Sequence, residues 1–115
     1  MKIKSIPSLS FLLEFSNIYD LKNHNSKIEY LKLIASFLKE ENSFNDLKTL
    51  FTDEELDFDL KERIIDKMRL IAQKEGNVSK EEVLSFLSEI KTSNNNLKIY
   101  IEKTINLLND VVLLN

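Results

Sequence analysis

The sequence predicts an all-α fold, a compact bundle of about five to six short helices with mostly antiparallel neighbours. The chain has 115 residues, a common size for one domain, and 43% hydrophobic against 30% charged residues is a globular composition. It contains one glycine and one proline, too few for the tight turns of a sheet protein. Apolar residues recur at three- and four-residue steps, which is typical of helices. A single helical domain over residues 1–115 is therefore expected.

The first helix is predicted over residues 8–21, with Pro7 near its start, where a missing N–H costs little. A polar loop over residues 22–25 follows and contains the only histidine, His24. Ser26 and Glu29 form a capping box, which predicts that a second helix begins there and ends near residues 41–42. The apolar positions are Leu9, Leu12, Leu13, Phe15 and Ile18 in the first helix, and Ile28, Leu31, Ile34, Ala35 and Leu38 in the second.

Ser43 predicts the start of a short third helix that runs to Phe51. A second box over residues 52–55 predicts one further helical turn. Asp59 is the predicted cap of the fourth helix, and Gly76 the residue that ends it. The buried stripe of this fourth helix is predicted to contain Leu60, Ile64, Ile65, Met68, Ile71 and Ala72.

Ser79 is the predicted cap of the fifth helix. The polar run over residues 92–96 is the most loop-like stretch of the chain and separates this helix from the sixth. The apolar stripes are Val83, Phe86, Leu87 and Ile90 in the fifth helix, and Leu97, Ile101, Ile105, Leu108 and Val112 in the sixth.

The composition argues against several kinds of chemistry. Without cysteine there is no disulfide, thiolate zinc site or cysteine nucleophile, and one histidine is too few for a zinc site. The chain lacks a glycine-rich loop for phosphate binding. No enzyme activity and no cofactor are therefore expected. No apolar run reaches the roughly 18 residues of a membrane span, and no convincing signal peptide is present, so a cytoplasmic protein is expected.

The charge is distributed unevenly along the chain. The net charge is +3 over residues 1–39, −7 over residues 40–66 and +1 over residues 67–115. The acidic middle argues against nucleic-acid binding, which needs a basic face, and suits a basic partner or a hard cation. Glu54, Glu55 and Asp57 are therefore candidate partner contacts. The alternative is that the acids of this segment cap helices and face solvent.

Residues 71–82 combine a helix end, a glycine turn, a cap and a helix start. The segment resembles the second half of a calcium-binding EF-hand loop, but Ile71 would stand at the first ligand position and offers no oxygen. Calcium binding of this kind is therefore not expected.

The same turn resembles the helix–turn–helix of tellurite-resistance B-like (TerB-like) domains, in which an Asp-Gly-x-apolar-Ser-x-x-Glu segment recurs twice. Residues 75–82, Glu-Gly-Asn-Val-Ser-Lys-Glu-Glu, match with Glu75 in place of Asp. The resemblance covers residues 71–90, with a fainter echo over residues 37–51 at a spacing of 34, as in an internal duplication. It implies a role in stress or phage defence and metal contacts through acids, for which Glu75 and Glu82 are the weak candidates.

The last helix is apolar over more than half its circumference, because Ile99, Leu107 and residues 111, 113 and 114 widen its stripe. Such a helix is either packed in the core or shared with another chain. The candidate partner surface is Leu97, Ile101, Ile105, Leu108 and Val112, together with the three acids of the middle segment.

The leading hypothesis is a non-enzymatic protein-interaction module, such as an adaptor, an immunity or inhibitor protein, or a small subunit. It would bind a protein partner or self-associate through the last helix. The alternatives are a TerB-like stress protein whose acids contact a divalent cation, and a small DNA-binding regulator that uses the turn at Gly76. Glu81 and Glu82 at the start of the would-be recognition helix argue against DNA binding.

Overall fold

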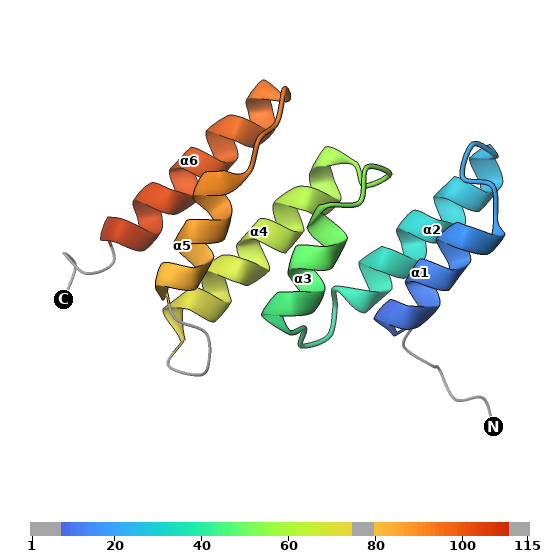
Figure 1. Ribbon diagram of the computed structural model, residues 1–115, viewed down its shortest axis with the longest axis horizontal. Helices are drawn as coiled ribbons and strands as arrows, with labels where there is room; N and C mark the ends of the chain where they lie inside the picture. The colour runs from blue at the N-terminus through green and yellow to red at the C-terminus, as the bar shows by residue number, and fades with distance from the viewer. Residues whose placement is uncertain (1–7, 75–79, 111–115) are drawn as a thin grey trace. The chain divides into compact units, whose positions relative to one another are not determined.

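The computed structural model describes residues 8–74 and 80–110, and this part of the chain is all-α, as predicted (Figure 1). It contains six helices and no strand. Their bounds are α1 Leu9–Ile18, α2 His24–Phe37, α3 Phe44–Phe51, α4 Phe58–Gln73, α5 Lys80–Glu89 and α6 Asn95–Asp110. None of these helices is both long and apolar enough to cross a membrane.

The chain divides into two compact units, Met1–Leu60 and Lys61–Asn115. The first unit holds α1, α2, α3 and the start of α4, and the second holds the rest of α4 with α5 and α6. Each unit contributes its own set of fully buried apolar side chains. The expectation of one domain over residues 1–115 stays a prediction.

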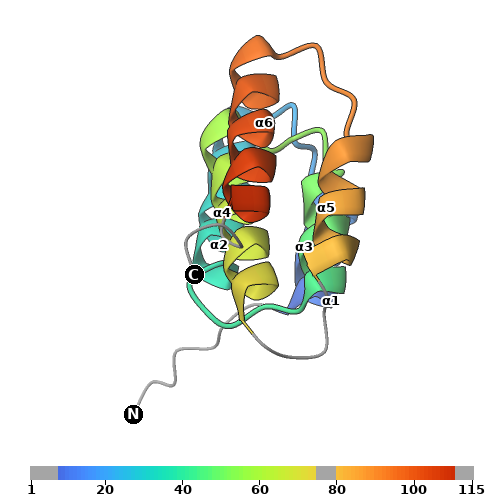
Figure 2. The same cartoon turned by 90° about the vertical axis from the view of Figure 1, so that its left-hand side faces the viewer.

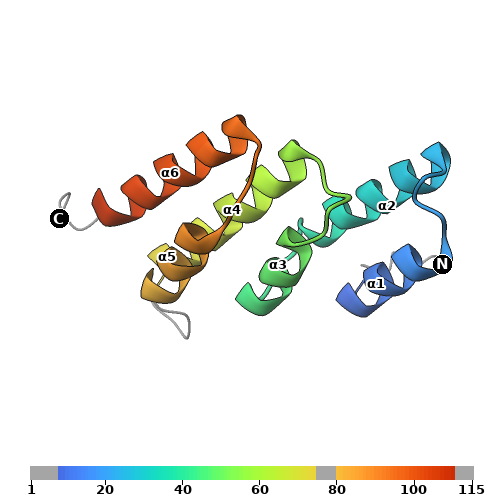
Figure 3. The ribbon, with the colours of Figure 1, turned by 45° about the horizontal axis from the view of Figure 1, so that its top comes forward.

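In the first unit, α1 and α2 lie side by side and run in opposite directions (Figures 1 and 3). The ring of Phe15 on α1 stacks on the ring of Tyr30 on α2, with 5.9 Å between centroids and 11° between planes. Offset stacking of aromatic rings adds to the stabilisation from their burial. Leu12 is the one residue of α1 that is fully buried, so α1 contributes few side chains to the interior.

In the second unit, α5 and α6 form a second antiparallel pair, joined by the connection over residues 90–94 (Figure 2). The hydroxyl of Tyr100 on α6 donates a hydrogen bond to Oδ1 of Asp66 on α4. Thr104 is buried, and its hydroxyl donates to the carbonyl of Tyr100 one turn earlier at 2.9 Å, so this buried polar group is satisfied.

The helices repeat in chain order as a short helix followed by a longer one. The short helices begin at Leu9, Phe44 and Lys80, and the longer ones at His24, Phe58 and Asn95, so each pair occupies about 35 residues. An Asn or Asp directly before each longer helix accepts a hydrogen bond from a backbone N–H in the first turn of that helix. These capping residues are Asn23, Asp57 and Asn94. Helix pairs repeated at such intervals are typical of tandem-repeat proteins. The interval is close to the 34-residue spacing between the two segments that resemble TerB-like domains.

The prediction for the start of the second helix was wrong. The helix begins at His24, because the side chain of Asn23 accepts from the N–H of Ser26 at 3.1 Å. Asn is as favourable a cap as Ser, and capping at Asn23 adds a turn to the helix. His24 is therefore the first residue of α2 and lies outside the loop that the sequence predicts, and it is exposed.

The predicted end of the second helix was also wrong. The helix ends at Phe37, and Leu38 is its C-cap. The side-chain amide of Asn42 donates to the carbonyl of Phe37 at 3.0 Å, which satisfies one of the carbonyls left open at the helix end.

Two predicted starts near the acidic segment differ as well. Thr52 opens no helical turn; it is the C-cap of α3, and its hydroxyl donates to the carbonyl of Thr49 at 2.8 Å. The cap of α4 is Asp57 and not Asp59, since Oδ1 of Asp57 accepts from the N–H of Leu60 at 3.0 Å. An aspartate directly before the helix can reach this N–H, whereas Asp59 already lies in the first turn.

Other boundaries agree more closely. Ser43 caps α3 as predicted and accepts from the N–H of Asp46 at 3.1 Å. The first helix ends at Ile18, earlier than predicted, with Tyr19 as its C-cap. The sixth begins at Asn95, inside the run predicted as a loop. The predicted cap Ser79 and the predicted stop Gly76 lie outside the described residues.

The predicted core is largely confirmed in α4, where Leu60, Ile64, Ile65 and Met68 are buried. In α2 the buried face of the helix is rotated relative to the predicted apolar stripe. Ile28 is 39% exposed, whereas Tyr30 and Phe37, which the sequence prediction left out, are buried beside Ile34 and Leu38. Because both aromatic rings lie inside, the helix turns Ile28 toward solvent.

Candidate functional site

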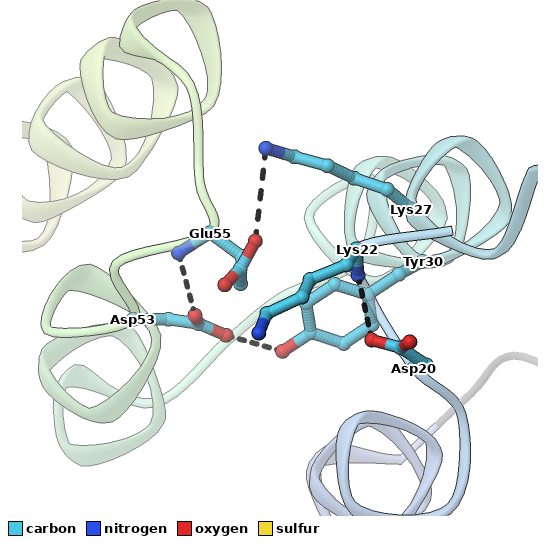
Figure 4. Close-up of polar contacts among 6 residues, drawn as sticks. All are labelled: Asp20, Lys22, Lys27, Tyr30, Asp53 and Glu55. Atoms are coloured by element: carbon cyan, nitrogen blue, oxygen red, sulfur yellow. Dashed lines mark hydrogen bonds and ion pairs between the residues drawn. The ribbon is translucent and has the colours of Figure 1, made fainter. Parts of the chain in front are cut away.

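The acidic segment after α3 is organised by Asp53. Its Oδ2 accepts a hydrogen bond from the hydroxyl of Tyr30 on α2, and its Oδ1 accepts from the N–H of Glu55 at 2.9 Å (Figure 4). Its backbone N–H donates to the carbonyl of Leu50 at 3.0 Å. One carboxylate therefore closes the turn after α3 and connects it to α2.

The hydroxyl of Tyr30 is held in a dry environment. Tyr30 is 0% exposed, and burial, followed by the hydrogen bond to the Asp53 carboxylate, raises the pKa of Tyr30 above its ordinary value. The group stays neutral and acts as a hydrogen-bond donor. The hydrogen bond connects α2 to the turn after α3.

The three acids predicted as partner contacts have different environments. Glu55 forms an ion pair with Lys27 of α2 at 3.6 Å, as Figure 4 shows. Asp57 is exposed and caps α4, and Glu54 is exposed in the turn. For Asp57 the capping interpretation is thus confirmed, and Glu54 is the acid of this trio most open to a partner.

The weak metal candidates do not come together in a described site. Glu75 lies outside the described residues, and Glu82 is exposed in the first turn of α5. Within residues 8–74 and 80–110, no three His, Asp or Glu side chains are grouped so that they could hold a metal ion.

The predicted partner surface on the last helix lies mostly inside the protein. Leu97, Ile101 and Leu108 are buried, and Ile105 is half-buried. This burial supports core packing, the first of the two alternatives for this helix. Val112 lies outside the described residues. The large apolar side chains that α6 exposes are Ile99 and Leu107, at 55% and 52%.

Among the described helices, α1 exposes the most large apolar side chains. Phe11, Ile18 and the cap residue Tyr19 are 46%, 69% and 50% exposed, and we call these three residues the α1 surface. Phe11 and Ile18 are two helical turns apart and share a face. The ring of Phe15 lies between Phe11 and Tyr19, at centroid distances of 6.4 Å and 4.5 Å. Of the three residues of the α1 surface, helical periodicity singled out Ile18 alone, and it did not show that Ile18 stays exposed.

A pocket of about 430 Å³ lies between α5 and α6. It is formed by the end of α5, the connection after it and residues 98–105 of α6. Its apolar wall consists of Leu87, Ile90, Ile101 and Ile105. Two of these, Ile101 and Ile105, belong to the stripe that the sequence assigns to a partner surface. The sequence alone offers no signal for the pocket, because it depends on how two helices pair.

Comparison with known protein families, with characterised proteins and with solved structures gives no match for this chain. The resemblance to TerB-like domains therefore stays a prediction, as do the metal-binding and DNA-binding alternatives.

Proposed function

We propose that this protein is a non-enzymatic helical interaction module that binds a protein partner through the α1 surface. The observation that carries this proposal is the exposure of three large apolar side chains, Phe11, Ile18 and Tyr19, at one short helix. Single exposed apolar residues are ordinary in proteins, whereas a cluster of them marks an interaction site.

The repeated helix pairs strengthen the proposal. Ser8 caps α1 and Ser43 caps α3 in the same way. In each case the serine Oγ accepts a hydrogen bond from the backbone N–H three residues later, at 3.1 Å. That third residue is Phe11 in α1 and Asp46 in α3. The capping hydrogen bond uses the backbone N–H of this residue in both helices, so it does not require an apolar side chain at Phe11. The apolar ring at this position favours a role in binding.

Charge supports the same conclusion. Glu14 is the one charged residue among the ten of α1. A partner would gain affinity mainly from burial of apolar area, at about 25 cal/mol per Å². Binding should consequently depend only weakly on salt, because screening acts on exposed charges.

The experiment is a quantitative pull-down from a lysate of the source cells with four forms of the protein. These are the wild type, Ile18→Ser, Phe11→Ser and the matched control Leu70→Ser, which removes a lone apolar residue of α4 that is 50% exposed. Circular dichroism and thermal melting first establish that all four are folded.

A partner that wild type and Leu70→Ser retain, and that both α1 variants lose by about tenfold or more, supports the proposal. Equal retention by all four forms, or no specific partner for the wild type, contradicts it. Sedimentation of the purified proteins shows whether the partner is a second copy of the chain.

A further inference from the structure

The pocket between α5 and α6 is lined by both apolar and charged residues. Leu87 and Ile101 are buried, whereas Lys91, Lys98 and Glu102 are exposed. Its volume of about 430 Å³ falls within the range of small-molecule sites, which are mostly apolar with a few polar groups that orient the ligand. The features of this pocket are independent of the α1 surface.

Lys91 and Lys98 line the pocket, and neither forms an ion pair with an acid in the described part of the chain; the ion pair found at 3.6 Å joins Lys27 to Glu55. The ammonium groups of Lys91 and Lys98 are thus open to an anion. Glu102 follows Lys98 by one helical turn and repels a negative ligand. With Lys91, Lys98 and Glu102, the pocket lining has a net charge of +1. A singly charged anion matches this balance better than a dianion does.

We propose that the pocket binds a small amphipathic monocarboxylate, with its apolar chain against the aliphatic wall and its carboxylate at Lys91 and Lys98. Burial of the apolar chain against the aliphatic residues supplies most of the affinity. The lysines select the charge of the head group and add a salt-dependent component. A neutral or cationic head group on the same chain binds more weakly.

The test is a titration of the full-length protein with octanoate, at concentrations where octanoate stays monomeric. The methyl resonances of Leu87, Ile90, Ile101 and Ile105 are followed by NMR. Octanol and octyltrimethylammonium are the matched probes. Saturable shifts at these methyl groups, with octanoate bound about threefold or more tightly than either probe, support the proposal. Absence of saturable shifts, or equal binding of all three probes, overturns it.

Three variants test the assignment of charge. Lys98→Gln should weaken octanoate binding by about threefold, and Glu102→Gln should tighten it by a similar factor. Lys103→Gln is the matched control, because Lys103 is exposed on α6 but does not line the pocket. An equal effect of Lys98→Gln and Lys103→Gln, or weaker binding by Glu102→Gln, contradicts the assignment.

Discussion

The hydroxyl of Tyr30 donates a hydrogen bond to the carboxylate of Asp53, 23 residues later in the chain. The ring of the same tyrosine stacks on Phe15 of α1. Tyr30 thereby links α1, α2 and the turn after α3 within the first unit. It lies at the centre of a small polar and aromatic cluster that the sequence patterns did not indicate.

Replacing Tyr30 by Phe should destabilise the protein by about 1–3 kcal/mol, because the half-buried carboxylate of Asp53 loses its donor while the ring remains. The measurement is urea denaturation followed by circular dichroism. Tyr19→Phe is the matched control, since Tyr19 is exposed and no hydrogen bond of its hydroxyl is found among the described residues. A loss below about 0.5 kcal/mol for Tyr30→Phe, or an equal loss for both variants, would contradict a stabilising role of this hydrogen bond.

Stability should fall as the pH rises above 10. Burial, followed by the hydrogen bond to Asp66, raises the pKa of Tyr100 from 10.0 to about 12. Between these values the unfolded chain releases the proton while the folded protein keeps it, so the equilibrium shifts toward unfolding. The stabilisation is complete below pH 10 and is lost as the pH approaches 12. Tyr30 adds to the effect in the same direction.

The variant Tyr100→Phe isolates this contribution. Its stability deficit relative to the wild type should be largest below pH 10 and should shrink as the pH rises toward 12. Urea midpoints of both proteins, measured across this range, provide the comparison. A deficit that stays constant with pH would show that the phenol does not titrate differently in the folded and unfolded states.

The start of α4 distinguishes two neighbouring aspartates. Asp57→Ala should cost about 1 kcal/mol, because the N–H of Leu60 loses its acceptor. Asp59→Ala should cost about 0.5 kcal/mol or less, since Asp59 acts only through its charge in the first turn. Urea denaturation of both variants measures the difference. A larger loss for Asp59→Ala would place the cap where the sequence predicted it.

The errors at the helix starts have one physical cause. Asn23 and Ser26 are both good caps, as are Asp57 and Asp59, so local chemistry allows two starts at each place. Sequence reasoning preferred the capping box, which adds a glutamate three residues later. In the structure the earlier residue caps the helix at both places, so each helix begins earlier than predicted. At Ser43 the prediction was confirmed, and the neighbouring Asn42 donates its side-chain amide to the carbonyl of Phe37 instead.

The candidate sites were less predictable than the helices. Periodicity identified an apolar stripe on α1 and another on α6 but did not show which side chains would face solvent. Leu97 and Leu108 are buried, although the sequence placed them on a partner surface, while Ile18 is 69% exposed. Lys98 likewise lines a pocket only because α5 and α6 pair.

The helical class, the approximate number and order of the helices, and the kinds of residue that begin them follow from the amino-acid sequence alone. These features depend on local interactions, which a stretch of a few residues specifies. Tertiary structure decided which competing cap is used, which apolar residues stay exposed on α1, and where a pocket opens beside α6. Those outcomes depend on contacts such as that between Tyr30 and Asp53, whose partners lie far apart in the chain.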